Sequence, residues 1–115
     1  AEEDYLLARS ALRRKQPLIY GACFHAQQCA EKYLKAALVA KGQTFPKVHD
    51  LLALNDLCAQ AGLFLGMDVD QLDILSSYAV RTRYPGDRPT PEEARQAIET
   101  AKTVRRFVRT ALGLK

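Results

Sequence analysis

The chain has 115 residues, of which 48% are hydrophobic and 26% are charged, and its net charge is +4. This size and composition predict a single folded domain over residues 1–115, and the lack of any run of 18 apolar residues excludes a membrane-spanning helix. The mild excess of positive charge is compatible with an acidic or nucleic-acid partner, but it does not require one.

Three cysteines occur in the sequence, at Cys23, Cys29 and Cys58. Their number is odd, and no two of them have the spacing of a zinc-binding pair. We therefore expect three buried thiols in a reducing compartment. The sequence shows no secretory signal, so the expected location is the cytoplasm.

Apolar residues at helical spacing predict helices along the whole sequence. The first helix is expected over residues 2–14, and Pro17 separates it from the next. The second and longest helix is expected over residues 18–41, where Gly42 suits a left-handed C-terminal stop. Its predicted buried stripe consists of Ile19, Ala22, Cys23, Ala26, Ala30, Tyr33, Leu34, Ala37 and Leu38.

Two shorter helices are expected next. The third begins near Asp50, whose carboxylate suits an N-cap, and it ends at Gly62. The fourth begins at Asp68 and is expected to end near Tyr84, because Pro85 disfavours helical dihedral angles in the residue before it. Both segments carry an apolar edge that would face the rest of the domain.

The fifth helix has the clearest start signal in the chain. Thr90, Pro91 and Glu93 form a capping box with proline at the first helical position, and the apolar stripe continues to Gly113. No segment alternates apolar and polar residues over the length of a strand. Because long amphipathic helices joined by short loops pack as antiparallel neighbours, we predict an all-α fold: an up-down four-helix bundle with an additional short helix.

A polar stripe interrupts the otherwise apolar second helix. Its members lie on or near one side of the helix, and they are His25, Gln28, Lys32 and Lys35, with Glu31 alongside. Glu31 and Lys35 are four residues apart, in the order that favours an ion pair. The spacing leaves two interpretations open: a solvent-exposed face with one ion pair, or a surface that meets other polar residues across an interface or cleft.

His49 and Asp50 lie between the second and third helices. One interpretation is structural: Asp50 caps the third helix, and His49 lies in the preceding turn. The other is acid–base chemistry, or the binding of a phosphate or a sugar. A single histidine beside a helix N-terminus does not decide between them, because the sequence places no second partner beside it.

A basic turn lies between the fourth and fifth helices, where Arg81, Arg83 and Arg88 surround Tyr84 and a Pro-Gly turn signal. Arginine binds phosphates through two parallel hydrogen bonds and tyrosine can stack on a base, so this turn is a candidate nucleotide site. The alternative is that Arg83 pairs with a carboxylate such as Glu31 while Tyr84 packs on the bundle.

Motifs for cofactors and metals are absent from the sequence. It contains no glycine-rich phosphate loop, no HExxH metal motif and no GxSxG nucleophile motif. His25 and His49 are its only histidines, and neither belongs to a zinc-binding spacing. We therefore expect no cofactor and no metal, and a conventional metabolic enzyme is disfavoured.

Taken together, several of these segments resemble the HEPN domain (higher eukaryotes and prokaryotes nucleotide-binding). The resemblance rests on HAQQCAEKYLKA at residues 25–36, on HDL at residues 49–51, on RYP at residues 83–85 and on the final Glu-Glu-Ala helix. It covers nearly the whole chain. It implies a helical bundle similar to the C-terminal domain of kanamycin nucleotidyltransferase, and it implies a homodimer.

The resemblance also implies a function. Stand-alone prokaryotic members are often encoded beside a minimal nucleotidyltransferase, as a two-component or toxin–antitoxin pair, and nucleotide binding is inferred for the family. Carried over by motif, the positions of interest are Glu31, Lys32, Lys35, His49, Asp50, Arg83 and Tyr84. With the basic turn included, the predicted ligand-binding residues are Lys32, Lys35, His49, Arg81, Arg83 and Tyr84. The predicted structural or interface residues are Gln28, Glu31 and Asp50.

One departure from the family concerns catalysis. HEPN ribonucleases resemble one another in an arginine followed, after four to six residues, by a histidine, whereas here ten residues separate Arg14 from His25 and no histidine follows Arg81. We therefore predict no catalytic residue, and a protein that binds a nucleotide or assists a separate nucleotidyltransferase. The alternatives are a metal-independent ribonuclease and a purely structural dimeric module. A membrane partner is not expected, and nucleic-acid binding is left open.

Overall fold

The computed structural model describes residues 1–80 and 88–114, and this part of the chain is helical with no strand. Its helices, in chain order, are α1 (Glu2–Arg13), α2 (Ile19–Ala40), α3 (Leu51–Gln60), α4 (Val69–Ser77) and α5 (Pro91–Ala111). The predicted all-α class is thereby confirmed. Within the described ranges, none of the helices combines the length and the apolar character needed to cross a membrane.

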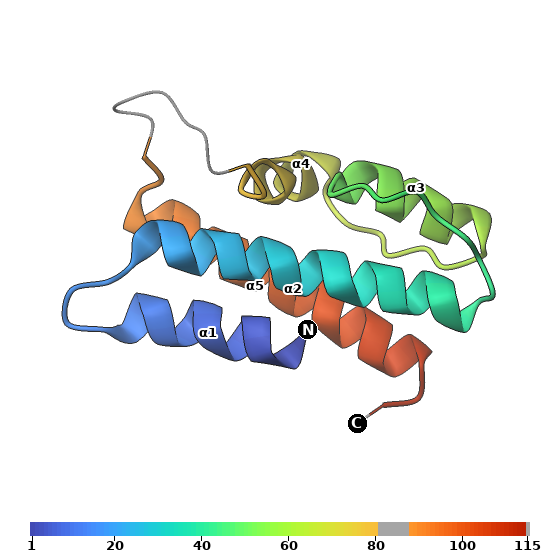
Figure 1. Cartoon of the computed structure of the whole chain (residues 1–115), viewed down its shortest axis with the longest axis horizontal. Coiled ribbons are helices and arrows are strands. Elements are labelled where there is room, and N and C mark those ends of the chain that lie inside the picture. The colour runs from blue at the N-terminus through green and yellow to red at the C-terminus, as the bar shows by residue number, and fades with distance from the viewer. Residues whose placement is uncertain (81–87, 115) are drawn as a thin grey trace.

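The longest helix, α2, lies at the centre of the fold and contacts each of the other four helices (Figure 1). On one side α1 packs along α2 and also contacts α5. On the opposite side α3 and α4 lie together against α2, and α4 also contacts α5. Neither α3 nor α4 touches α1. The central helix therefore has two separate borders, one with α1 and one with the α3–α4 pair.

Helices α2 and α5 pack against each other, and both bury small side chains. Ala26 and Ala30 on α2 and Ala94 and Ala101 on α5 are completely buried. Leucines and valines fill the rest of the core, and full burial of each such side chain stabilises the fold by about 1.5–3 kcal/mol. The three cysteines are buried, as predicted.

Short polar side chains begin the last three helices. Asp50 caps α3 by accepting the N–H of Leu52 at 3.0 Å, and Asp68 caps α4 in the same way. Thr90 and Glu93 form the predicted capping box at the start of α5. Each of these side chains binds an N–H group that has no partner inside its own helix.

The predicted end of the fourth helix near Tyr84 is wrong, because α4 ends at Ser77. The N–H of Tyr78 closes the helix with a bond of 3.1 Å to the carbonyl of Leu75, and the Tyr78 side chain is buried. Pro85 restricts only the residue immediately before it. Pro85 therefore gives only the last position at which the helix could end. The helix ends earlier, at Ser77, immediately before the buried Tyr78.

Candidate ligand-binding site between helix α2 and the start of helix α3

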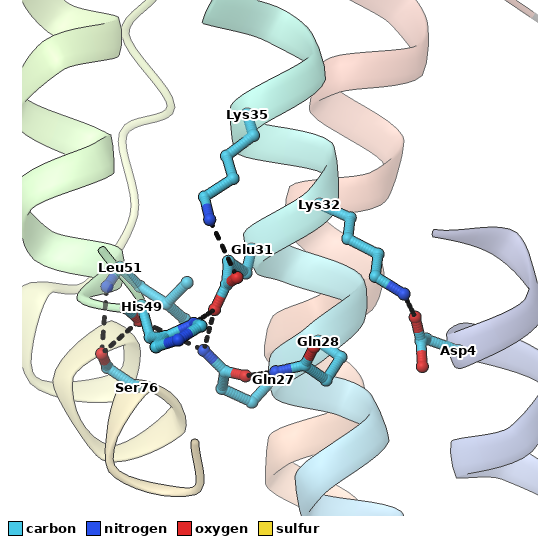
Figure 2. A network of polar contacts seen from close by, with 9 residues as sticks. All are labelled: Asp4, Gln27, Gln28, Glu31, Lys32, Lys35, His49, Leu51 and Ser76. Carbon is cyan, nitrogen blue, oxygen red and sulfur yellow. Dashed lines mark hydrogen bonds and ion pairs between the residues drawn. The ribbon is translucent and has the colours of Figure 1, made fainter. Parts of the chain in front are cut away.

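Glu31 lies in the middle of α2, and its side chain is only 6% exposed. A buried carboxylate is costly unless hydrogen-bond donors surround it. Three donors do so here: Gln27 Nε2 at 3.0 Å, Lys35 Nζ at 3.1 Å and His49 Nδ1 at 2.9 Å. Figure 2 shows that Gln27 and Lys35 come from α2 itself, whereas His49 reaches the carboxylate from the segment before α3.

The protonation of Glu31 determines which nitrogen of His49 carries hydrogen. Burial raises the pKa of Glu31, but the hydrogen bonds from Gln27, His49 and Lys35 outweigh burial, and the pKa lies below its ordinary value. The carboxylate is therefore ionised at neutral pH and can only accept, so His49 Nδ1 is the donor. Within the described part of the chain nothing bonds to Nε2, and the side chain of His49 is 70% exposed.

Lys35 stands one helical turn after Glu31, and its side chain is one-quarter exposed. Its ammonium also lies 6.0 Å from the centre of the Phe45 ring, at the outer limit of a cation–π attraction. An ammonium group has three N–H donors, and Glu31 takes one of them. Lys35 can therefore offer its remaining donors to an anion without leaving the carboxylate.

The backbone at His49 is held by a second set of hydrogen bonds (Figure 2). The carbonyl oxygen of His49 accepts from Gln27 Nε2 at 3.2 Å and from Ser76 Oγ at 3.4 Å. Ser76 Oγ in turn accepts the N–H of Leu51 at 3.0 Å. On α2, Gln28 Nε2 donates to Gln27 Oε1 at 2.7 Å. This network connects α2, the start of α3 and the last turn of α4.

Sequence reasoning missed Gln27 and Ser76. A signal for Gln27 exists, because it follows Cys23 by four residues and precedes Ala30 by three, which puts it on the apolar stripe of α2. A glutamine on such a stripe is expected to be buried and to need hydrogen-bond partners inside the fold, and Gln27 is indeed completely buried. Ser76 lies on a short helix with no comparable pattern.

Lys32 faces the other border of α2. Its ammonium binds one oxygen of the Asp4 carboxylate on α1 at 2.5 Å, and His25 Nδ1 lies 2.9 Å from the other oxygen. Burial raises the pKa of Asp4, yet the hydrogen bonds from Lys32 and His25 bring it below its usual value. The polar stripe of α2 is thus divided between two borders, and Lys32 points away from Glu31 (Figure 2).

Three predicted ligand-binding residues, Arg81, Arg83 and Tyr84, lie outside the described residues. Among residues 1–80 and 88–114, no group of three or more histidine, cysteine, aspartate or glutamate side chains is placed to hold a metal ion. A surface groove of about 400 Å³ runs between α1 and α5, and it shares no residue with the site around Glu31. The structure therefore brings together Glu31, Lys35 and His49.

All residues of this site lie in the part of the chain that matches a known sequence family. Residues 1–111 match the family model of the HEPN domain, and that range includes all five helices and every residue of the network around Glu31. Searches of the curated proteins and of the solved structures found no match.

Proposed function

Because the chain belongs to the HEPN domain family, we propose that it is a non-catalytic protein that binds the phosphate groups of a nucleotide between α2 and the start of α3. The observation that supports this proposal is the convergence of Lys35 Nζ and His49 Nδ1 on the buried Glu31 carboxylate, at 3.1 and 2.9 Å. Both partners keep part of their side chain exposed, so the Lys35 ammonium, and Nε2 of His49 when its ring is protonated, are donors that are already in place before a ligand arrives.

The net charge of Glu31, Lys35 and His49 together favours the binding of an anion when the His49 ring is protonated. The Glu31 carboxylate balances the Lys35 ammonium, so the trio carries a net positive charge when His49 is protonated and none when it is neutral. A phosphate group would accept hydrogen bonds from Lys35 and from Nε2 of the protonated ring. Arg81, Arg83 and Tyr84 remain proposed contributors from the sequence, for the phosphates and for the base.

We further propose that the protein works as a homodimer beside a separately encoded minimal nucleotidyltransferase, in the manner of toxin–antitoxin pairs. The four-helix bundle with an additional short helix, similar to the C-terminal domain of kanamycin nucleotidyltransferase, belongs to the same proposal. The support for these points is the family membership together with the all-helical architecture. Light scattering of the purified protein tests the dimer, and co-purification with the product of a neighbouring nucleotidyltransferase gene tests the partner.

Titration calorimetry with ATP and GTP tests nucleotide binding. We expect heat with the wild-type protein and weaker binding by the His49→Ala and Lys35→Ala variants. An absence of heat with both nucleotides, with and without the nucleotidyltransferase, would contradict the proposal.

A second candidate is metal-independent cleavage of RNA, and one observation favours it. The Glu31 carboxylate orients the His49 ring through Nδ1 and leaves Nε2 outward, which is the arrangement that prepares an imidazole for proton transfer. The absence of the arginine-to-histidine spacing of HEPN ribonucleases argues against it. RNA that the wild-type protein leaves intact, or that His49→Ala cleaves equally well, would exclude a mechanism through His49.

A further inference from the structure

Of Glu31, Lys35 and His49, the last is the most exposed, and it precedes α3 rather than lying within a helix. A side chain in such a place is ordered only if its backbone is held. The His49 carbonyl oxygen accepts two hydrogen bonds from side chains, one from Gln27 on α2 and one from Ser76 on α4. Two helices that flank this peptide in space therefore fix it.

Gln27 connects both the backbone and the ring of His49 to α2. Its amide nitrogen has two hydrogens, and its two acceptors are the Glu31 carboxylate at 3.0 Å and the His49 carbonyl at 3.2 Å. Its amide oxygen accepts from Gln28 at 2.7 Å, so only one orientation of the amide satisfies every partner. Gln27 binds the carbonyl of His49 directly, and it binds the ring of His49 indirectly, through Glu31. Both parts of His49 are thereby held on α2.

Ser76 holds the His49 peptide from α4, as Gln27 does from α2. The N–H of Leu51 is the first of α3 and has no partner inside that helix. Ser76 Oγ accepts this N–H at 3.0 Å and donates to the His49 carbonyl at 3.4 Å. A hydroxyl from α4 thus supplies a cap to α3 and holds the peptide group that carries the histidine.

We propose that Gln27 and Ser76 are positioning residues, which keep the His49 ring on Glu31 with Nε2 turned toward the ligand. Neither residue contacts the ligand, because both act through His49. As far as the ligand is concerned, this inference rests on the proposed nucleotide binding. The orientation of the ring is a property of the free protein and is measured without any ligand.

Ser76→Ala tests the inference, and Ser77→Ala is its matched control. Ser77 is the next residue of α4, and among residues 1–80 and 88–114 its hydroxyl bonds only to the Ile74 carbonyl of the same helix, at 2.6 Å. In the free protein, Ser76→Ala is expected to speed hydrogen exchange of the Leu51 amide by about tenfold or more, since that amide loses its acceptor. Nitrogen NMR of His49 is expected to change from the Nδ1–H tautomer to a mixture of tautomers.

Ser77→Ala should leave both signals at their wild-type values, and Ser76→Thr should restore them because it keeps the hydroxyl. ATP titrations should show binding about fivefold weaker for Ser76→Ala, the size of one lost hydrogen bond, and unchanged for Ser77→Ala. A Gln27→Leu variant is expected to shift the His49 tautomer as well.

The possible results separate the two proposals. If the wild-type protein binds neither ATP nor GTP, with or without the nucleotidyltransferase, the proposed function fails, while the exchange rate of Leu51 and the tautomer of His49 still decide the positioning role. If Ser76→Ala leaves both of these signals unchanged, the positioning role of Ser76 is overturned. A folded Gln27→Leu variant that keeps the wild-type tautomer would overturn that of Gln27.

Discussion

His49 Nδ1 lies 2.9 Å from a carboxylate oxygen of Glu31, although 18 positions separate the two residues in the chain. This contact joins the middle of the longest helix to the segment that begins α3. It also places an exposed ring on a buried charge, so the same pair contributes to stability and to the proposed binding site.

Glu31→Gln is expected to lower the free energy of unfolding by about 2–3 kcal/mol, because it removes a buried charge that Lys35 and His49 pair with. Urea denaturation at pH 7 measures the change. Glu92→Gln is the control: its ion pair with Arg95 is exposed, and such pairs contribute no more than about 1 kcal/mol. Equal losses for the two variants would mean that Glu31 is not held as described.

Lys35→Ala is expected to weaken nucleotide binding about tenfold or more, whereas Lys32→Ala should change it less than about twofold. The two variants should differ because the two lysine side chains point to opposite borders of α2: Lys35 binds Glu31 at the proposed site, while Lys32 binds Asp4 on the other side. Parallel titrations of the two variants with ATP measure both effects. Comparable weakening by both substitutions would indicate that the ligand reaches the α1 side of α2.

The stability of the fold is expected to fall in acid. Hydrogen bonds from Arg105 at 2.7 and 2.6 Å lower the pKa of Glu2 from 4.5 to about 2. Because the pKa is lower in the folded state, this contribution is fully present above the unfolded value and is lost as the pH falls from 4.5 toward 2. The pKa values of Asp4 and Glu31 are also lowered, so they act in the same direction.

The urea midpoint, followed between pH 5 and pH 2, measures this loss. A Glu2→Gln variant should show a shallower decline than the wild-type protein, since one of the shifted carboxyl groups is gone. Identical declines would show that Glu2 keeps an ordinary pKa in the folded protein.

None of the three thiols should react with a disulfide reagent in the folded protein at pH 8. All are buried, and burial raises the pKa of Cys29 to about 12. All three should react once guanidinium unfolds the chain. Rapid labelling of one cysteine under native conditions would show that its helix opens readily, and mass spectrometry would identify which one.

Thr90→Ala is expected to lower the free energy of unfolding by about 1 kcal/mol, because it removes the capping box of α5. Thr103→Ala is the control within the same helix. The Thr103 hydroxyl bonds to the Glu99 carbonyl, a contact that helices do not need, so its loss should be neutral or slightly stabilising. Thermal unfolding of both variants tests the contrast, and equal destabilisation would contradict it.

The helices and most of their ends could be predicted from the sequence. Apolar periodicity marks α2 and α5, and Asp50, Asp68 and Thr90 mark the starts of the last three helices. These signals are local, because a cap or an amphipathic stripe depends on residues within one or two helical turns. The predicted end of α4 is wrong because Pro85 sets only the last position at which the helix could end. The burial of Tyr78, next to the observed end at Ser77, is a feature of the tertiary structure.

The sequence by itself determined the helical class, the family and the residues from which a site could be built. Only the tertiary structure decided how they group. Lys32 and Lys35 are three positions apart on one helix, yet Lys32 pairs with Asp4 of α1 and Lys35 with the Glu31 that His49 also binds. The physical reason is burial: Asp4 and Glu31 lose water on opposite borders of α2, and each carboxylate is bound by at least one donor that is distant in the chain, Lys32 and His25 for Asp4 and His49 for Glu31.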